Sequence, residues 1–259
     1  NRPRVEVDFF SGGQGDAAFI QTQLGHQILI DGGPNSSVLE KLGKQMPFLD
    51  KSIDAVVLTH PESDHMEGLL QVLQRYKVNY FLWSGVVRYT PEYKQLLDVL
   101  AKAQKNGTKI IAVNAGQKIK AGKAELNIIY PLENLNGKAL EKTSNDACVV
   151  LRLTFGKTSF LFTGDISGDL EKQFVSKNIF YLSDVLKVAH HGSKYSTSDI
   201  FLQNLKAKIA VVSVGKDNTY GHPAAEALQR LQNYGIKTLR TDIDGDVRLM
   251  SDGNNININ

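Results

Sequence analysis

Short apolar runs alternate with amphipathic segments along most of this 259-residue chain. Runs that are continuously apolar, or apolar at every second position, predict β-strands, and apolar residues three or four positions apart predict helices. The predicted strands lie at residues 5–10, 17–22, 27–30, 53–58, three within 109–130, 148–155, 158–162, 185–189, 209–214, 236–240 and 246–250. The predicted helices lie at residues 37–42, 66–76, 91–104, 168–175, 197–205 and 224–234.

The order of these segments predicts an α/β fold. Both halves begin with strands and then alternate between strands and helices, which fits two mixed sheets packed together with helices outside. We predict one domain over residues 1–251, because chains of this length form single α/β units. The polar tail 252–259 is expected to be frayed.

Composition limits the possible functions only loosely. The net charge of +3 permits a polyanionic partner without demanding one, because nucleic-acid affinity depends on local clusters of Lys and Arg. Cys148 is the single cysteine, which excludes an internal disulfide and a thiolate-rich zinc site, and its apolar neighbours predict that it is buried. The chain has no run of eighteen apolar residues and therefore no predicted membrane span.

The segment 59–69 carries the strongest chemical signal. His60, Glu62, Asp64 and His65 follow the apolar strand 53–58 and precede a helix, so four metal-capable side chains gather at one strand end. Residues 60, 62 and 64 alternate in an extended loop, whereas the adjacent side chains of Asp64 and His65 must diverge. One group of side chains can therefore bind a first cation, and the other group a second cation beside it. Carboxylates and imidazoles suit zinc or manganese equally. The competing interpretation is a polar helix start with incidental histidines.

Other predicted strands also end in polar side chains. Asp165 follows the strand 158–162, where a simple turn is the alternative interpretation. His190 and His191 follow the strand 185–189; one can reach a metal while the other contacts substrate, or both can be loop residues facing solvent. Asp31 follows the strand 27–30 and is placed to orient a metal-binding histidine from behind.

Two glycine-containing loops complete the pattern. In the loop after the strand 209–214, Asn218 and His222 could hydrogen-bond an oxyanion, or could serve only as turn residues. The glycine-rich loop 12–16 lies between two strands and lacks the following helix of a dinucleotide-binding or P-loop signature, so both signatures are rejected.

Together these segments resemble the metallo-β-lactamase superfamily. Asp31, the block 60–65, Asp165 and His190 occur in the order of the superfamily's motifs, each after a predicted strand. Within the superfamily, the chain is most similar to the soluble C-terminal domain of ComEC-type competence proteins, which take part in DNA uptake, and to its free-standing relatives. The resemblance covers nearly the whole chain and lies in segments 13–16, 59–65, 145–151, 163–165, 190–193, 221–223 and 241–245. It implies a four-layer αββα sandwich.

The chain departs from the superfamily pattern at several positions. Glu62 stands where members with two zinc sites usually carry histidine, and Asn145 replaces another expected histidine. Ser11 replaces an aspartate of the first loop, which weakens any role for that loop. The oxygen-rich substitutions favour manganese or magnesium over zinc at the first metal site.

The resemblance implies a metal-dependent hydrolase, with a phosphodiesterase or nuclease acting on DNA in competence as the first hypothesis. Two divalent ions, manganese or zinc, would activate a water as the nucleophile. Asp64 would accept its proton, and His222 is the second catalytic candidate. The expected metal ligands are His60, Glu62, Asp64, His65, Asp165 and His190, with Asp31 behind them. The expected substrate-binding residues are Asn145, His191, Ser193, Lys194, Asn218 and His222.

Two other hypotheses keep the fold. The substrate could be an ester, a lactam or a phosphorylated envelope component, since one scaffold hosts many chemistries. Alternatively, Ser11, Glu62 and Asn145 could mark a non-catalytic binding domain with a degenerate metal site. The resemblance also implies an extracytoplasmic monomer, secreted or tethered to the membrane, whose partners are DNA and a membrane channel or anchor absent from this chain.

Overall fold

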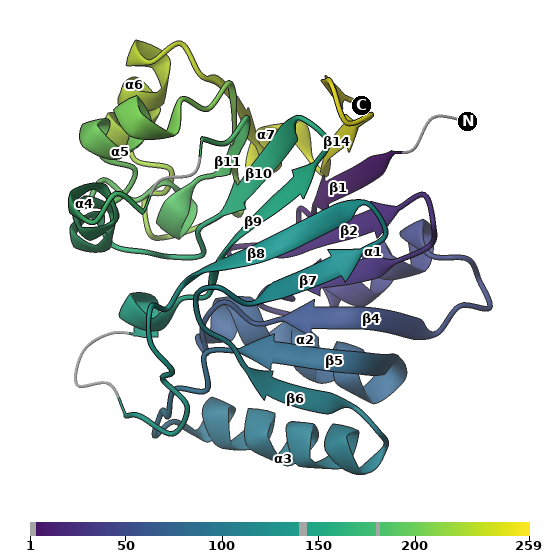
Figure 1. Cartoon of the computed structure of the whole chain (residues 1–259). Helices are drawn as coiled ribbons and strands as arrows, with labels where there is room; N and C mark the ends of the chain where they lie inside the picture. The colour runs from purple at the N-terminus through teal and green to yellow at the C-terminus, as the bar shows by residue number, and fades with distance from the viewer. Residues whose placement is uncertain (1–3, 140–143, 180–181) are drawn as a thin grey trace.

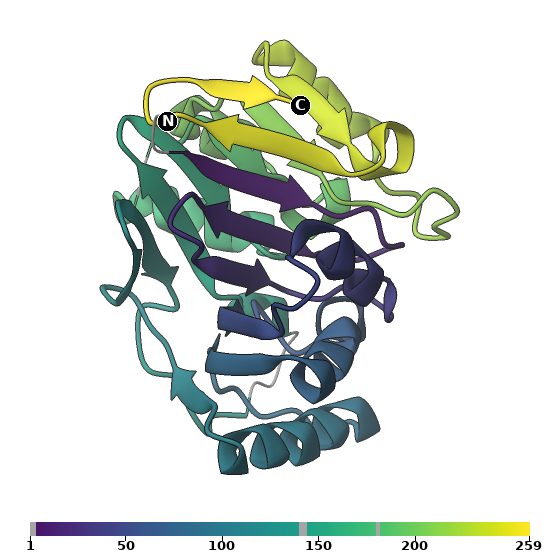
Figure 2. The same ribbon diagram turned by 90° about the vertical axis from the view of Figure 1, so that its right-hand side faces the viewer.

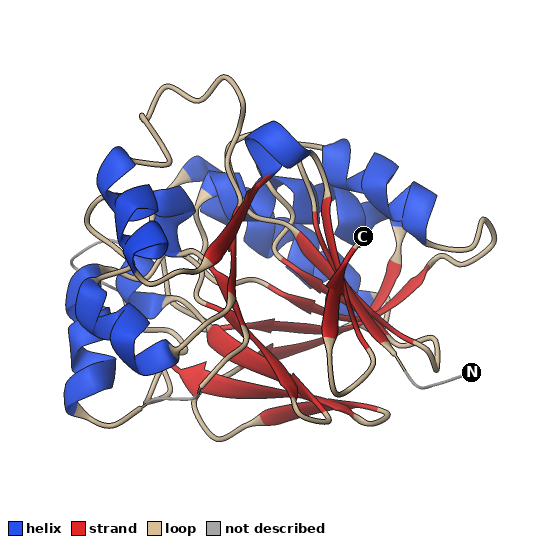
Figure 3. Ribbon diagram, turned by 90° about the horizontal axis from the view of Figure 1, so that it is seen from above, coloured by secondary structure: helices blue, strands red, loops and turns tan. Residues whose placement is uncertain are grey.

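The computed structural model describes residues 4–139, 144–179 and 182–259. Two β-sheets pack face to face, and helices cover the outer face of each sheet (Figures 1 and 3). The predicted four-layer αββα sandwich is therefore confirmed. Among the described residues, no helix is both long and apolar enough to cross a membrane.

The first sheet has eight strands in the order β15-β14-β1-β2-β3-β4-β5-β6. Its strands are β1 (Val5–Phe9), β2 (Ala18–Thr22), β3 (Gln27–Ile30), β4 (Ser52–Val57), β5 (Lys77–Trp83), β6 (Lys109–Ala112), β14 (Val247–Ser251) and β15 (Ile256–Ile258). From β3 to β6 the neighbouring strands are parallel, so their carboxyl ends lie at one edge. The helices of this half are α1 (Ser37–Gln45), α2 (Ser63–Arg75) and α3 (Pro91–Lys105).

The second sheet has seven strands in the order β13-β12-β11-β10-β9-β8-β7. Its strands are β7 (Lys118–Ala121), β8 (Ala124–Tyr130), β9 (Val150–Phe155), β10 (Thr158–Phe162), β11 (Val185–Lys187), β12 (Ile209–Val212) and β13 (Lys237–Arg240). Its helices are α4 (Gly168–Ser176), α5 (Asp199–Leu205), α6 (Ala225–Asn233) and the short α7 (Thr241–Asp244), with 3-10 turns at Ser144–Ala147 and Ala189–Gly192. The strands β10 to β13 are parallel and also deliver their carboxyl ends to one edge.

Among the described residues, three large apolar clusters hold the four layers together. The largest lies between the sheets, where the rings of Phe9 and Phe162 stack with centroids 5.8 Å apart. A second cluster joins the first sheet to α1, α2 and α3 through residues such as Leu42, Leu69 and Leu96. The third joins the second sheet to its helices. Burial of these apolar side chains is what favours the sandwich over separate sheets.

Two strands, β5 and β15, were not predicted from the sequence. The strand β5 pairs with β4 and β6 inside the first sheet. The prediction that the tail 252–259 is frayed was wrong, because β15 pairs antiparallel with β14 at the sheet edge (Figure 2). The turn before β15 is closed by Asp252, whose Oδ1 accepts hydrogen bonds from the backbone N–H groups of Asn254 and Asn255. Backbone pairing, together with the packing of Ile256 against the core between the sheets, thus orders a segment that is otherwise mostly polar.

Candidate metal centre and pocket

The loops that follow the carboxyl ends of the central strands surround one open pocket. Its volume is about 490 Å³. Polar and titratable side chains dominate its wall. The lining residues are Gln14, His60, Glu62, Ser63, Asp64, Arg88, Asn145, Asp165, His190, His191, Tyr220 and His222.

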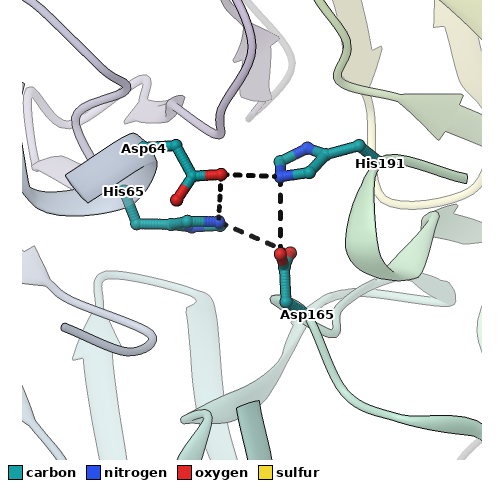
Figure 4. Close-up of side chains that lie close together, drawn as sticks. All are labelled: Asp64, His65, Asp165 and His191. Carbon is teal, nitrogen blue, oxygen red and sulfur yellow. Dashed lines mark hydrogen bonds and ion pairs between the residues drawn. The ribbon is translucent and has the colours of Figure 1, made fainter. Parts of the chain in front are cut away.

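Four side chains form a candidate metal centre: Asp64, His65, Asp165 and His191 (Figure 4). All but the buried His65 line the pocket. One nitrogen or oxygen atom from each of the four lies within 4.8 Å of the others. His65 Nε2 lies 3.4 Å from Asp165 Oδ1, and His191 Nε2 lies 3.3 Å from Asp64 Oδ2. The chain folds residues from α2, the end of β10 and the turn after β11 into a space that one cation could fill.

The chemistry of these atoms fits a divalent cation. His65 Nε2 and Asp165 Oδ1 are buried and form no hydrogen bond within the part of the chain that the structure describes. Buried polar atoms normally have a partner, and two imidazoles with two carboxylates are a common ligand set for zinc or manganese. The centre therefore has the donors and the unfilled bonding capacity that a metal site requires.

Local charges set the protonation of this cluster. Although burial opposes it, the carboxylate of Asp165 raises the pKa of His65 well above its usual value, with further contributions from Asp31 and Asp16. Burial also opposes ionisation of Asp165, but His191 and His65 hold the pKa of this carboxyl well below its usual range. The carboxylates are ionised, and a cation would replace the imidazolium protons as their counter-charge.

Asp31 lies directly behind the centre, where the sequence analysis expected it. Its Oδ2 is 2.9 Å from His65 Nδ1, and its Oδ1 accepts a hydrogen bond from the backbone N–H of Thr59. The backbone of Asp31 is left-handed, with φ 57°, an unfavourable conformation for a residue with a side chain. These contacts hold the His65 ring with Nε2 pointing toward Asp165, the arrangement that metal-binding histidines use.

The two adjacent histidines after β11 point to different places. Both have left-handed backbones, with φ 50° at His190 and 52° at His191. His191 is buried, and its Nδ1 lies 2.9 Å from the carbonyl oxygen of Ser213. His190 stays partly exposed, with its Nε2 3.9 Å from Asp165 Oδ2. The structure thus groups His191, predicted to bind substrate, with the metal-capable residues, and sets the predicted ligand His190 farther out on the pocket wall.

His60 and Glu62 lie beside the four-residue centre rather than within it. His60 Nε2 is 4.0 Å from Asp165 Oδ2, and burial, then the charge of His65, lowers the pKa of His60 to about 3. Its imidazole is therefore neutral and able to bind a metal. Glu62 Oε1, by contrast, accepts hydrogen bonds from Arg88, at 3.0 Å, and from the Ser144 hydroxyl.

The predicted substrate-binding residues separate into two groups. Asn145 and His222 line the pocket with His190 and His191. Asn218 does not line it; its side-chain amide donates to the carbonyl oxygens of Gly215 and His222 and so shapes the loop that carries His222. Ser193 is buried, with its hydroxyl accepting from the backbone N–H of Tyr195, and Lys194 is exposed outside the pocket wall.

Three charged residues of this region were not predicted as site residues from the sequence. Arg88 lines the pocket. Lys187 and Asp16 form an ion pair below it, and Asp16 Oδ1 lies 3.3 Å from His191 Nδ1. Lys187 lies inside the apolar run 185–189, a position that predicts a buried lysine. Because an unpaired buried ammonium is costly, this position also indicates an acidic partner. Asp16 belongs to the glycine-rich loop whose role had been discounted on account of Ser11.

Comparison with known proteins identifies the class to which this fold and centre belong. A family profile described as "Beta-lactamase superfamily domain" matches residues 26–202, and the chain belongs to that family. The metallo-β-lactamase fold protein YhfI from Bacillus subtilis shares this architecture, with a TM-score of 0.64 and 17% identity over 96% of this chain and 100% of YhfI.

Two relatives carry competence-related names. The chain is 33% identical to ComE operon protein 3 of Bacillus subtilis (strain 168), over 94% of this chain and 32% of that protein. It is 28% identical to competence protein ComA of Neisseria gonorrhoeae, over 92% of this chain and 31% of that protein. The chain thus spans about a third of the length of these relatives. The predicted resemblance to competence proteins of this superfamily is confirmed.

Proposed function

We propose that this chain is a metal-dependent hydrolase that cleaves phosphodiester bonds of DNA. The observation that supports the proposal most directly is the grouping of Asp64, His65, Asp165 and His191, three of which line an open pocket. These residues would hold one divalent cation, manganese or zinc. Such a cation, when bound, lowers the pKa of water and stabilises charge on phosphate oxygens. Of the two residues expected to bind a second cation beside the centre, His60 remains available, because Glu62 already accepts a hydrogen bond from Arg88.

Asp64 is the proposed proton acceptor. Its side chain is 34% exposed and lines the pocket, so it can reach a bound water. Burial disfavours its ionised form, but the hydrogen bond from His191 and the charges of His65 and His191 together outweigh burial and lower the pKa of Asp64. The carboxylate is therefore ionised at neutral pH and can take a proton as the water oxygen bonds to phosphorus.

His222 is the proposed contact for the leaving oxygen. It lines the pocket beside His190, with ring centroids 5.7 Å apart, and its Nδ1 is buried without a hydrogen bond among the described residues. Burial, followed by the charge of His190, lowers the pKa of His222, so its ring is neutral at pH 7 and retains one N–H donor. That donor can hydrogen-bond the oxygen that departs as the phosphorus–oxygen bond breaks.

The test is cleavage of fluorescent single-stranded and duplex oligonucleotides by the purified protein with added manganese or zinc. We expect cleavage that EDTA abolishes, and a loss of at least about a hundredfold for Asp64→Asn with an unchanged circular dichroism spectrum. A wild-type protein that hydrolyses a neutral ester or a lactam but no oligonucleotide would reject DNA as the substrate. Full activity of Asp64→Asn would reject the assigned role.

We also propose that this activity serves DNA uptake outside the cytoplasm. The support is the similarity to proteins named for competence, together with an open pocket rich in polar groups. In this proposal the chain acts as a monomer beside a membrane channel or anchor supplied by other residues or another protein. Protease added to intact spheroplasts should digest the domain; complete protection until lysis would place it in the cytoplasm and contradict the proposal.

A further inference from the structure

Arg88 places a permanent positive charge in the pocket wall, and it is not one of the metal-capable residues. It lies between β5 and α3, and its side chain is 25% exposed. Among the residues that the structure describes, the rest of the pocket wall includes Glu62, Asp64 and Asp165 but no second Arg or Lys. An anionic substrate that enters the pocket therefore meets one permanent cation among these lining side chains.

Glu62 holds this guanidinium from one side. Its Oε1 accepts a hydrogen bond from Arg88 Nη2 at 3.0 Å and another from the Ser144 hydroxyl. Arg88 Nε is buried and has no hydrogen-bond partner among the residues that the structure describes. A guanidinium has five N–H donors in a fixed plane, so the contact with Glu62 orients it while leaving donors for a second acceptor.

The backbone that carries Arg88 is anchored on both sides of the loop. The N–H of Val87 donates to the carbonyl oxygen of Lys138 at 2.9 Å, and the N–H of Gly137 donates to the carbonyl oxygen of Gly85 at 2.9 Å. Val86 is buried in a small apolar cluster with Leu135 and Ala147. The guanidinium is therefore held before any ligand arrives, which reduces the entropy lost on binding.

We propose that Arg88 is a specificity-determining residue that binds a phosphate oxygen of the substrate, and that Glu62 is its positioning residue rather than a metal ligand. Arginine suits this task because its planar donors match the spacing of phosphate oxygens. The inference rests on the proposed function for its substrate and names the contact that selects phosphodiesters over neutral esters.

The first experiment measures the affinity for a fluorescein-labelled twelve-residue oligothymidylate by anisotropy, in EDTA to prevent cleavage, over a range of NaCl concentrations. Arg88→Gln should weaken binding about tenfold and reduce the slope of log affinity against log salt by about 0.7, the value for one phosphate contact in a single strand. Arg88→Lys should keep the slope and recover only part of the affinity. The matched control is Arg75→Gln, which removes an exposed arginine at the far end of α2.

The second experiment separates the two roles of Glu62. Manganese affinity is measured by calorimetry for wild type, Glu62→Gln and Asp165→Asn. If Glu62 positions Arg88, Glu62→Gln should bind manganese within about twofold of wild type but bind the oligonucleotide more weakly, whereas Asp165→Asn should lose manganese affinity about tenfold or more. A loss of manganese affinity in Glu62→Gln equal to that in Asp165→Asn would overturn the positioning role.

Failure of this inference can be distinguished from failure of the proposed function. If wild type binds the oligonucleotide and Arg88→Gln binds it as tightly as Arg75→Gln, the role of Arg88 is rejected while the nuclease proposal stands. If wild type neither binds nor cleaves DNA, the nuclease proposal is rejected and inorganic phosphate becomes the probe. Weaker phosphate binding by Arg88→Gln than by Arg75→Gln then supports the anion site, and equal or absent binding rejects it.

Discussion

Lys187 Nζ and the Asp16 carboxylate form an ion pair beneath the pocket, with side chains only 4% and 8% exposed. Lys187 also lies 3.8 Å from Asp165 Oδ1 and donates to the carbonyl oxygen of Gly164. The ammonium thus neutralises a region where Asp16, Asp31 and Asp165 lie close together. Asp16 in turn lies next to His191, so the pair connects the first loop of the chain to the metal-capable centre.

Replacing Lys187 with Met should destabilise the fold by about 3 kcal/mol, because removing one partner leaves a buried carboxylate without its counter-charge. Urea unfolding in EDTA measures the change. The double variant Lys187→Met with Asp16→Asn should recover much of the loss, because no uncompensated charge remains at this position. A single-variant loss below about 1 kcal/mol would contradict the structural role assigned to the pair.

Replacing Asp31 with Asn should weaken metal binding about tenfold to a hundredfold, because the carboxylate orients His65 and increases its basicity. Calorimetric titration with zinc and manganese measures the affinity. Asp98→Asn, on the exposed face of α3, is the control for the charge change and should bind as wild type does. Equal affinities for Asp31→Asn and Asp98→Asn would show that the contact with His65 does not affect the metal.

Removal of divalent ions should lower the melting temperature. A ligand that binds only the folded state at one hundred times its dissociation constant stabilises that state by about 2.7 kcal/mol, and the four-residue centre exists only when the chain is folded. Differential scanning calorimetry with manganese and with EDTA measures the shift. The double variant Asp64→Asn with Asp165→Asn should melt at the same temperature in both conditions; an equal metal-dependent shift there would place the stabilising ion elsewhere.

Asp8 should make the stability of the fold depend on pH. Burial raises its pKa from 3.8 to about 6, although the hydrogen bond from Arg248 opposes this. The folded state therefore binds the proton more tightly than the unfolded state, so the contribution is complete below about pH 4 and is lost as pH rises through 6.

Asp8→Asn should remove this pH dependence. Relative to wild type, the variant should gain about 2 kcal/mol of stability on moving from pH 4 to pH 8, a figure in line with a shift of about two pKa units. Unfolding curves of both proteins at the two pH values measure the difference. A constant difference between wild type and variant would show that Asp8 does not titrate in this range.

The positions of most strands and helices could be predicted from the chain. Local periodicity identified β4, α2, β9 and β10 because each buries a continuous or regularly spaced apolar set. The strand β5 was not predicted because it follows α2 directly, and its first half contains Lys77, Asn79 and Tyr80. The strand β15 was not predicted because it is short, and its order depends on pairing with β14 and on the packing of Ile256 against the core, which local composition does not reveal.

The candidate centre was predictable in its elements but not in its atoms. A polar side chain just beyond a buried strand is a local pattern, and it marked Asp31, Asp64, His65 and Asp165. The choice between His190 and His191 depends on two left-handed backbone conformations. Arg88, the hydrogen-bond partner of Glu62, lies in a loop 26 residues away along the chain. The residues near Glu62 therefore do not predict this contact.

The sequence by itself determined the alternation of strands and helices, the family resemblance and the strand ends at which chemistry collects. These features depend on near neighbours in the chain, whose spacing sets which face of an element is apolar. Only the tertiary structure decided which side chains share a cation-sized space, since Asp64 and His191 stand 127 residues apart yet lie 3.3 Å from each other. Such contacts follow from how two sheets pack, and packing depends on the whole core rather than on any segment.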